Sequence, residues 1–316
     1  MRYQALGTSG LTVSRIGLGA NNFGRRVDLA RTRTVVDAAL DAGITLVDTA
    51  DIYGDRNSES FLGEVLEGRR DQVVLATKFG MDMGGELGPD WGARGSRRYI
   101  RRAVEASLRK LRTDWIDLYQ YHVPDGVTPA AETLATLDEI VREGKVRYIG
   151  SSNFAGWQVA DAEWTARSAG GTPFVSAQNN YSLLDRSAER ELVPACARFG
   201  IGILPYFPLA SGLLSGKYRR GEPAPSGTRL EASVGSMRDR VFDALEKLEA
   251  FAQERGVTML DVAIGWLASR PAVGSVIAGA TRPEQVQANV AAGEWEPSAD
   301  DCAALDAIVR PGSKVN

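Results

Sequence analysis

The sequence predicts an α/β fold, a (β/α)8 TIM barrel with an N-terminal β-hairpin and long loops after barrel strands 3 and 7. Short β-branched runs alternate with longer segments of helical periodicity along the whole chain. At most steps the predicted strands end about 30 residues apart, which is the length of one βα unit. Eight such units fit within 316 residues. This number of repeats favours a closed barrel over a doubly wound open sheet.

The eight barrel strands are short apolar runs rich in β-branched residues. They are predicted over residues 16–19, 44–48, 72–78, 115–122, 145–151, 174–178, 202–206 and 273–278. Amphipathic segments follow them and predict helices over residues 29–42, 58–66, 97–111, 129–143, 157–168, 188–199, 237–254, 258–268 and 283–291. Gly43 is a typical stop for the first helix, and Pro129 suits the first turn of the fourth.

Three further features complete the predicted architecture. Residues 1–15 contain two short strand-like runs around Thr8-Ser9-Gly10, which predicts a hairpin that covers the bottom of the barrel. Residues 80–96 and 207–236 are long loops that follow strand ends, and loops of this kind are usually lids or binding loops. No linker rich in Pro, Gly or Ser divides the chain, so residues 1–316 are expected to form one domain.

The composition excludes several classes of protein. Lys and Arg number 37 and Asp and Glu number 40, a net charge of −3 that argues against a nucleic-acid partner. His122 is the single histidine, and Cys196 and Cys302 lie far apart, so no zinc-finger or multi-histidine metal site is expected. No signal-peptide pattern or membrane-length apolar run is seen, so a cytoplasmic protein without a membrane partner is expected. A monomer and a homo-oligomer both remain open.

Four side chains that can move protons lie at predicted strand ends. Asp48 ends the second strand, Lys78 the third and His122 the fourth, and Tyr53 follows Asp48 by five residues. Active sites of TIM barrels are built at the C-terminal ends of the strands. Each residue alone has an ordinary structural explanation, but their placement on three consecutive strands predicts an active site.

These four residue types together suit proton transfer to a carbonyl group. A phenol such as Tyr53 titrates near pH 10 in water, and a neighbouring lysine ammonium lowers that pKa. A carboxylate such as Asp48 holds the lysine and offsets the cost of burying it. A histidine orients the carbonyl oxygen by hydrogen bonding. No protein group donates hydride, so a nicotinamide cofactor and a small carbonyl substrate are expected.

The chain resembles the aldo-keto reductase family over essentially its full length. The motifs that carry the resemblance are Asp-Thr-Ala-x-x-Tyr-Gly over 48–54, Leu-Tyr-x-x-His over 118–122, Gly-Leu-Gly over 17–19 and Arg-Tyr-Ile-Gly-Ser-Ser-Asn-Phe over 147–154. The subgroup that it resembles is the bacterial branch related to potassium-channel β subunits. The resemblance implies NADP(H)-dependent reduction of an aldehyde or ketone, with Tyr53, Lys78, Asp48 and His122 as the catalytic tetrad.

The resemblance also implies a set of cofactor contacts. Ser152, Asn153 and Gln178 match positions that hydrogen-bond the nicotinamide carboxamide, and Tyr206 matches the aromatic residue that stacks on the ring. The remaining implied contacts are Gly19, Ala20 and Asn21 after the first strand, Phe207, Pro208, Leu209, Ser211 and Lys217 at the pyrophosphate, and Gly279, Thr281, Arg282, Gln285 and Asn289 at the adenine end. Phe207 departs from the usual serine, which removes a side-chain hydroxyl from this set.

The choice between NADP and NAD depends on the adenine end. Arg282 lies at a predicted helix start, and both an arginine and a helix N-terminus attract a 2′-phosphate. Gln285 and Ala288 replace residues that many family members use there. The sequence therefore favours NADP, with NAD as the alternative. Phe23, Trp91 and Tyr121 are the candidates for an aromatic substrate pocket.

The sequence lacks the motifs of two other classes of nicotinamide-dependent enzyme. The glycines at 17 and 19 lack the third glycine and the acidic residue of a Rossmann dinucleotide motif. No tyrosine has the lysine four residues later that a short-chain dehydrogenase requires. Two alternatives stay open: an enone or sugar-nucleotide reductase of the same family, and a cofactor-sensing regulatory subunit. His122 favours carbonyl chemistry over enone reduction, because some alkene reducers of the family carry Glu at that position.

Overall fold

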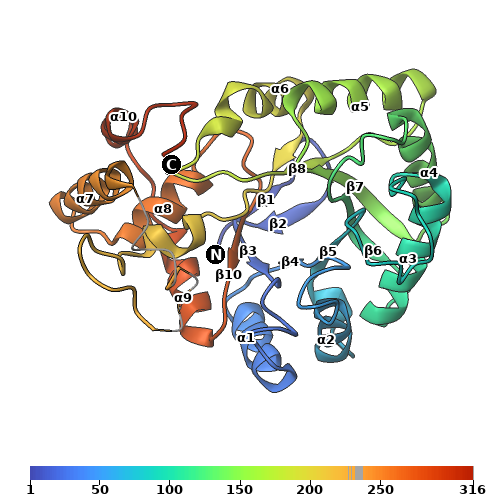
Figure 1. The fold of residues 1–316 in the computed structure, drawn as a ribbon, viewed down its shortest axis with the longest axis horizontal. Helices are drawn as coiled ribbons and strands as arrows, with labels where there is room; N and C mark the ends of the chain where they lie inside the picture. The colour runs from blue at the N-terminus through green and yellow to red at the C-terminus, as the bar shows by residue number, and fades with distance from the viewer. Residues whose placement is uncertain (227, 229, 232–237, 316) are drawn as a thin grey trace.

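The computed structural model describes residues 1–226, 228, 230–231 and 238–315. Its centre is a curled sheet of eight parallel strands, surrounded by helices (Figure 1). In spatial order the strands are β10 (Val276–Gly279), β3 (Ile16–Gly19), β4 (Leu46–Asp48), β5 (Val74–Phe79), β6 (Ile116–Tyr121), β7 (Val146–Ser152), β8 (Ser176–Gln178) and β9 (Gly202–Ile203).

The two ends of the sheet meet near Ile203. Its N–H donates to the carbonyl oxygen of Ala272 at 2.6 Å, and its carbonyl accepts from the N–H of Gly274 at 2.8 Å. An isolated parallel bridge pairs it with Val273, just before β10. The strands of the sheet are buried along nearly their whole length, because helices cover the outer face and side chains fill the inner one. This arrangement is consistent with the expected (β/α)8 barrel.

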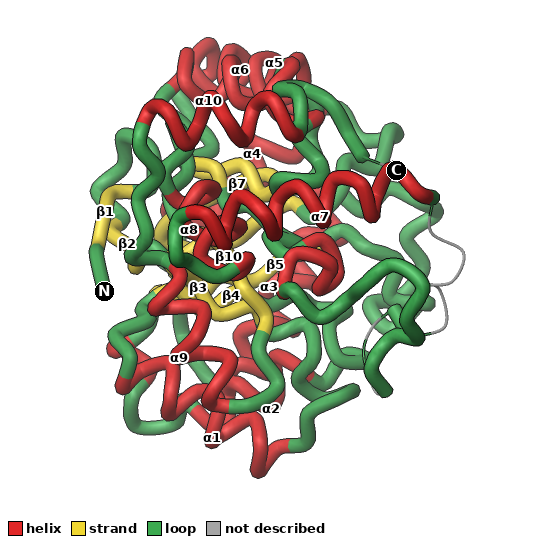
Figure 2. Tube along the Cα trace, turned by 90° about the vertical axis from the view of Figure 1, so that its left-hand side faces the viewer, coloured by secondary structure: helices red, strands yellow, loops and turns green. Residues whose placement is uncertain are grey.

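The helices lie outside the sheet, as Figures 1 and 2 show from two directions. Their bounds are α1 Leu29–Asp41, α2 Ser58–Val65, α3 Arg97–Leu111, α4 Ala130–Arg142, α5 Gly156–Ala169, α6 Leu192–Phe199, α7 Asp239–Glu254, α8 Met259–Ala268, α9 Pro283–Ala292 and α10 Ala299–Ile308. Each long helix buries one stripe; in α3 the buried residues include Ile100, Val104, Leu108 and Leu111, which recur at helical spacing.

The N-terminal hairpin is present and covers one end of the barrel. Strands β1 (Tyr3–Ala5) and β2 (Thr12–Ser14) pair antiparallel. Leu6, in the turn, is fully buried against Leu46 of β4 and other inner residues of the strands. A Cβ at Gly202 or Gly274 would lie 2.5 or 2.4 Å from the Leu6 side chain, so only glycine leaves room for it.

Several elements differ from the prediction. Only the first two residues of the predicted strand 202–206 pair as β9, and the helix predicted from residue 188 begins at Leu192, after the 3-10 turn η2 (Ser187–Arg190). The 3-10 turns η1 (Arg70–Gln72) and η3 (Ala210–Ser215) were not predicted. Positions 227, 229 and 232–236 of the predicted long loop, and position 237 of the following helix, lie outside the described residues.

Helix α10 was missed because its pattern is weak. Among its residues only Leu305 is buried, so no apolar stripe marks it in the sequence. The signal that was overlooked is the capping box before it. Ser298 accepts a hydrogen bond from the N–H of Asp301, and the Asp301 side chain accepts one from the N–H of Ser298. Within the described residues, no helix is long and apolar enough to cross a membrane.

Candidate active site

The four predicted catalytic residues gather at the C-terminal end of the barrel. Asp48 ends β4, Lys78 is the second-last residue of β5, and His122 directly follows β6. Tyr53 lies in the turn after β4. Asp48, Tyr53 and His122 line a cavity of about 850 Å3, which is within the usual size of a small-molecule site.

Lys78 connects Asp48 to Tyr53. Its Nζ donates a hydrogen bond of 2.7 Å to Asp48 Oδ2 and one of 3.2 Å to the Tyr53 hydroxyl. A third bond of 2.7 Å goes to the carbonyl oxygen of Thr49. All three donors of the ammonium are therefore satisfied, although Lys78 has no exposed surface.

Burial and charge set the protonation states of this group. Burial disfavours the charge of Lys78, but the Asp48 carboxylate and Tyr53 outweigh it and raise the pKa of Lys78 above its ordinary value. Burial raises the pKa of Tyr53 as well, although the Lys78 ammonium acts to lower it. The sequence-based expectation considered only the lysine. Because desolvation dominates, Tyr53 keeps its proton at neutral pH.

His122 faces Tyr53 across the site as a neutral imidazole. The two rings lie edge to face with centroids 5.7 Å apart. Burial and the Lys78 ammonium lower the pKa of His122 to about 3. Its Nδ1 has no hydrogen-bond partner among the described residues. A neutral imidazole has one N–H donor and one acceptor, so it can donate a hydrogen bond to a substrate oxygen.

The second oxygen of Asp48 is held by two amides. Gln178 Nε2 donates to Asp48 Oδ1 at 2.8 Å, and Gln120 Nε2 donates to the same atom at 3.2 Å. Gln120 was not predicted as a site residue. The signal was present in the alternation of the strand, because residues two apart face the same side and Gln120 lies two before His122.

Two glycines fix the turn that carries Tyr53. Gly54 has φ of +59°, and a Cβ there would lie 1.6 Å from the carbonyl oxygen of Phe23. Gly24 has φ of +89°, and a Cβ there would lie 2.7 Å from the carbonyl oxygen of Gly54. The turn after β3 and the turn after β4 therefore touch through their backbones, and this contact positions Tyr53.

Nearly all predicted cofactor residues line the large cavity. They are Gly19, Asn21, Ser152, Asn153, Gln178, Tyr206, Phe207, Pro208, Leu209, Ser211, Lys217, Gly279, Thr281, Arg282, Gln285 and Asn289. Ala20 does not line it. It is fully buried, and its carbonyl oxygen accepts a hydrogen bond from Ser58 Oγ. Ala20 therefore supports the turn from behind rather than facing the cavity.

The polar residues next to His122 form a connected network. Asn153 Nδ2 donates to the carbonyl oxygen of His122 at 3.0 Å, and Asn153 Oδ1 accepts from the Tyr206 hydroxyl at 2.7 Å. Ser152 Oγ donates to the carbonyl oxygen of Gln178 at 2.9 Å. These amide and hydroxyl groups suit the donor and acceptor of a nicotinamide carboxamide, and the Tyr206 ring lies beside them.

The loop after β9 places a tight turn and a lysine at the wall of the large cavity. Ser211 and Gly212 both have left-handed backbones, with φ of 60° and 100°. A Cβ at Gly212 would lie 3.2 Å from Lys217 Nζ, so the ammonium lies directly over this bare stretch of backbone. An ammonium at this point of the cavity wall suits the oxygens of a pyrophosphate.

The adenine end is organised around the start of α9. Gln285 Oε1 accepts hydrogen bonds from the N–H and the hydroxyl of Thr281, at 2.8 and 3.1 Å. Arg282 is the N-cap residue and is 68% exposed in its side chain, 3.9 Å from a carboxylate oxygen of the exposed Glu284. A guanidinium this loosely held is available to a phosphate at the cavity edge.

The three predicted substrate residues lie outside the large cavity. Phe23 is fully buried beneath the turn that supports Tyr53, and Trp91 is 76% exposed on the loop after β5. Tyr121 lines a different, smaller pocket. None of the three lines the large cavity.

Arg26, which was not predicted, does line the cavity. Its guanidinium has no hydrogen-bond or ion-pair partner within the described part of the chain. The overlooked signal was its position in the loop after the first barrel strand.

The described residues also hold no group of three or more His, Cys, Asp or Glu that could bind a metal ion.

Comparisons with known proteins identify the family of this chain. A family model described as "Aldo/keto reductase family" matches residues 15–310. An uncharacterized oxidoreductase YrpG of Bacillus subtilis is 39% identical over 302 residues, which cover 93% of this chain and 91% of that protein. A probable voltage-gated potassium channel subunit beta of rice (Oryza sativa subsp. japonica) is 35% identical, covering 92% and 91%. An NADH-specific methylglyoxal reductase of Escherichia coli is 37% identical over 313 residues, covering 92% and 93%. The chain belongs to the aldo/keto reductase family.

Proposed function

We propose that this protein reduces small aldehydes or ketones to alcohols with NADPH as hydride donor. The observation that carries the proposal is the Lys78 ammonium bonded to both Asp48 and the Tyr53 hydroxyl. This arrangement holds a protonated phenol next to a cation that stabilises the phenolate formed when the proton leaves. A general acid of this kind at a cavity wall is what carbonyl reduction requires.

Each polar group has one task in the reaction. A bound nicotinamide would supply the hydride that forms the new C–H bond at the carbonyl carbon, which leaves negative charge on the carbonyl oxygen. Tyr53 gives its hydroxyl proton to that oxygen, which forms the O–H bond of the alcohol and leaves a phenolate. Lys78 stabilises the resulting phenolate, and Asp48 keeps Lys78 charged and in place. His122 donates a hydrogen bond to the carbonyl oxygen and positions it beside Tyr53.

The preference for NADPH is part of the proposal. Arg282 is the N-cap residue of α9, and both its guanidinium and the N-terminus of that helix favour binding of a 2′-phosphate. One relative is named for NADH specificity, so NADH is the competing donor. Direct comparison of the two cofactors decides between them.

Arg26 narrows the substrate class. Its turn contacts the turn of Tyr53 through Gly24 and Gly54, and Arg26 lines the same cavity as the proton donor. Without a protein partner among the described residues, this cation favours a carbonyl substrate that carries a carboxylate or phosphate. We include such anionic aldehydes among the preferred substrates.

The similarity to the rice channel subunit supports a second candidate, a cofactor-binding regulatory subunit. The complete tetrad favours an enzyme, because a sensor of bound cofactor needs no proton donor at the cavity wall. An assay of turnover on a panel of aldehydes and ketones, measured as the loss of NADPH absorbance, distinguishes an enzyme from a regulatory subunit. Binding of NADPH without turnover on any member of the panel identifies the regulatory function.

Tyr53→Phe tests the proposed proton donor. We expect kcat for reduction to fall by about 100-fold or more, because a positioned general acid contributes at least that much. The Kd for NADPH, measured by fluorescence titration, should stay within about twofold, since the ring and its packing are kept. Tyr181→Phe is the control, a buried tyrosine whose hydroxyl bonds to Glu189 away from the cavity. A Tyr53→Phe protein with wild-type turnover contradicts the assignment.

A further inference from the structure

A second, smaller pocket lies beside the ends of β6 and β7 and is separate from the large cavity. It encloses about 220 Å3 and shares no lining residue with the cavity. Tyr121 of β6 lines the pocket, whereas the next residue, His122, lines the cavity. Neighbouring residues of a strand face opposite sides, so the same strand end serves both spaces. Phe154 likewise lines the pocket, next to the cavity residue Asn153.

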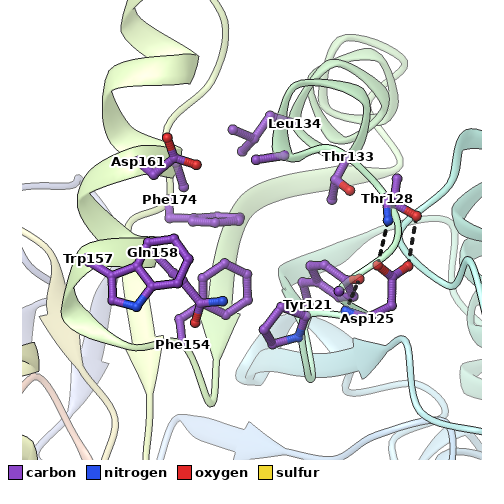
Figure 3. Close-up of a pocket in the computed structure, with 14 residues that line it drawn as sticks. Tyr121, Asp125, Thr128, Thr133, Leu134, Phe154, Trp157, Gln158, Asp161 and Phe174 are labelled. Carbon is purple, nitrogen blue, oxygen red and sulfur yellow. Dashed lines mark hydrogen bonds between the residues drawn. The ribbon is translucent and has the colours of Figure 1, made fainter.

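The inner wall of the pocket is aromatic. Phe154 packs edge to face against Tyr121 and against Phe174, with ring centroids 5.8 Å apart in both pairs. These three rings are buried. Trp157, in the first turn of α5, lies beside them and is 63% exposed (Figure 3). The pocket therefore has a rigid apolar floor and one indole ring at its opening.

The pocket is preformed, because its polar rim is already fixed. The Tyr121 ring stacks on Phe79 at 5.0 Å, and its hydroxyl accepts a hydrogen bond from the N–H of Asp125. The Asp125 carboxylate accepts from the N–H groups of Gly95 and Thr128, among others. A ligand that enters here does not have to order the loop before it binds.

The charges around the pocket have one sign. Asp125 and Asp161 line it, and no lysine or arginine does. Asp125 is saturated by hydrogen bonds from its own loop, which hold it in the charged form. Asp161 lies one helical turn after Trp157 and is exposed; it has no hydrogen-bond or ion-pair partner in the described part of the chain (Figure 3). A free carboxylate beside aromatic faces attracts organic cations.

We propose that this pocket binds a small organic cation with an aromatic or aliphatic body. The apolar body lies on Phe154 and Phe174, and the ammonium group lies between Trp157 and the Asp161 carboxylate. The volume suits a small amine and excludes a nucleotide. This inference goes beyond the proposed reductase function and does not depend on it, since no residue of the tetrad or of the cofactor site takes part.

Three matched probes test the charge preference. They are 2-phenylethylamine, the neutral 2-phenylethanol and the anionic 3-phenylpropionate, titrated against the full chain by ligand-observed NMR, with and without saturating NADPH. We expect the amine to bind at least about fivefold more tightly than the alcohol, and the acid to bind more weakly still. Saturating NADPH should leave the Kd of the amine unchanged, because the two sites share no residue.

Variants on one helix locate the binding site. Trp157→Ala should weaken amine binding by about fivefold, and Asp161→Asn should remove most of the preference for amine over alcohol. Trp164→Ala is the matched control, a tryptophan of α5 that is 54% exposed and does not line the pocket. The proposal is overturned if the three probes bind alike, if NADPH displaces the amine, or if Trp157→Ala and Trp164→Ala behave the same. None of these outcomes depends on whether the protein reduces carbonyl compounds.

Discussion

Lys78 donates a hydrogen bond of 2.7 Å to Asp48 at a place where neither side chain is more than 3% exposed. A buried ammonium and a buried carboxylate each carry a large desolvation cost, which their mutual attraction offsets. In the proposed mechanism this pair holds a cation next to Tyr53, and removal of either partner would leave the other charge buried and unpaired. This relationship links the chemistry of the site to the stability of the barrel.

Asp48→Asn is expected to destabilise the protein strongly. The variant keeps the shape of the side chain but leaves Lys78 buried without a counter-charge, at a cost of about 3 kcal/mol in the free energy of unfolding. The double variant Asp48→Asn, Lys78→Met should recover most of that loss. Urea unfolding followed by circular dichroism measures both. Glu249→Gln, which breaks the more exposed pair with Arg219, should cost less than about 1 kcal/mol. Equal losses for the buried and exposed pairs would contradict the argument.

His122 is expected to stay neutral throughout the physiological pH range. Its pKa in the folded protein is about 3, below the ordinary value of 6.5. It is the single histidine in the chain, so its imidazole NMR signals are unambiguous. We expect no change in their shifts between pH 5 and 8. A titration midpoint near pH 6.5 in the folded protein would show that the imidazole is not desolvated as described.

The same shift predicts how stability depends on pH. Between pH 6.5 and about 3 the unfolded chain binds a proton at His122 and the folded chain does not. The contribution of His122 is therefore complete above pH 6.5 and decreases as the pH falls towards 3. In His122→Gln, the loss of unfolding free energy on moving from pH 7 to pH 5 should be smaller than in the wild type. An equal loss in both proteins would contradict the prediction.

Arg282→Gln is expected to separate the two cofactors. Loss of the guanidinium removes a contact that only the 2′-phosphate makes, so kcat/KM with NADPH should fall by about tenfold while the value with NADH changes little. Lys217→Gln is the control, because Lys217 lies over the loop that we assign to the pyrophosphate, which both cofactors contain. It should lower both values alike. A parallel loss for NADPH and NADH in Arg282→Gln would show that Arg282 does not read the 2′-phosphate.

Arg26→Gln tests the preference for anionic substrates. We expect kcat/KM for succinic semialdehyde to fall by about tenfold and that for butanal to stay nearly constant, since only the first carries a carboxylate. Arg25→Gln is the matched control, because Arg25 is the neighbouring exposed arginine and does not line the cavity. The KM for NADPH should not change in either variant. An increase in that KM would instead assign Arg26 to the cofactor.

Much of the site could be predicted because its residues lie at strand ends, which the local sequence pattern identifies. Asp48, Lys78 and His122 lie within one residue of the ends of buried strands, and parallel strands bring such ends to one edge of a sheet. Helices with a clear apolar stripe, such as α3, were predicted to within a residue. Helix α10 was missed since only Leu305 of its residues is buried, which leaves no periodic signal.

Other features depended on contacts between segments far apart in the sequence. Phe23 and Tyr121 have the residue types of a substrate pocket, but Phe23 is fully buried and Tyr121 lines the smaller pocket, so neither lines the large cavity. Arg26 lines the cavity, and its turn contacts the Gly54 turn, which lies about 30 residues away in the sequence and is not predicted by any local pattern. The pKa of Tyr53 also differs from the expectation. Burial in the surrounding core raises this pKa by more than the neighbouring Lys78 lowers it.

The sequence by itself determined the order of strands and helices and the chemistry at the strand ends. Both depend on short-range periodicity and on residue types at the ends of elements, which the chain carries locally. The tertiary structure alone decided which neighbouring residue faces which space, as with His122 in the cavity and Tyr121 in the second pocket. The physical reason is that burial, electrostatic environment and pocket shape each depend on residues from many segments of the chain. These residues come together only in the folded barrel.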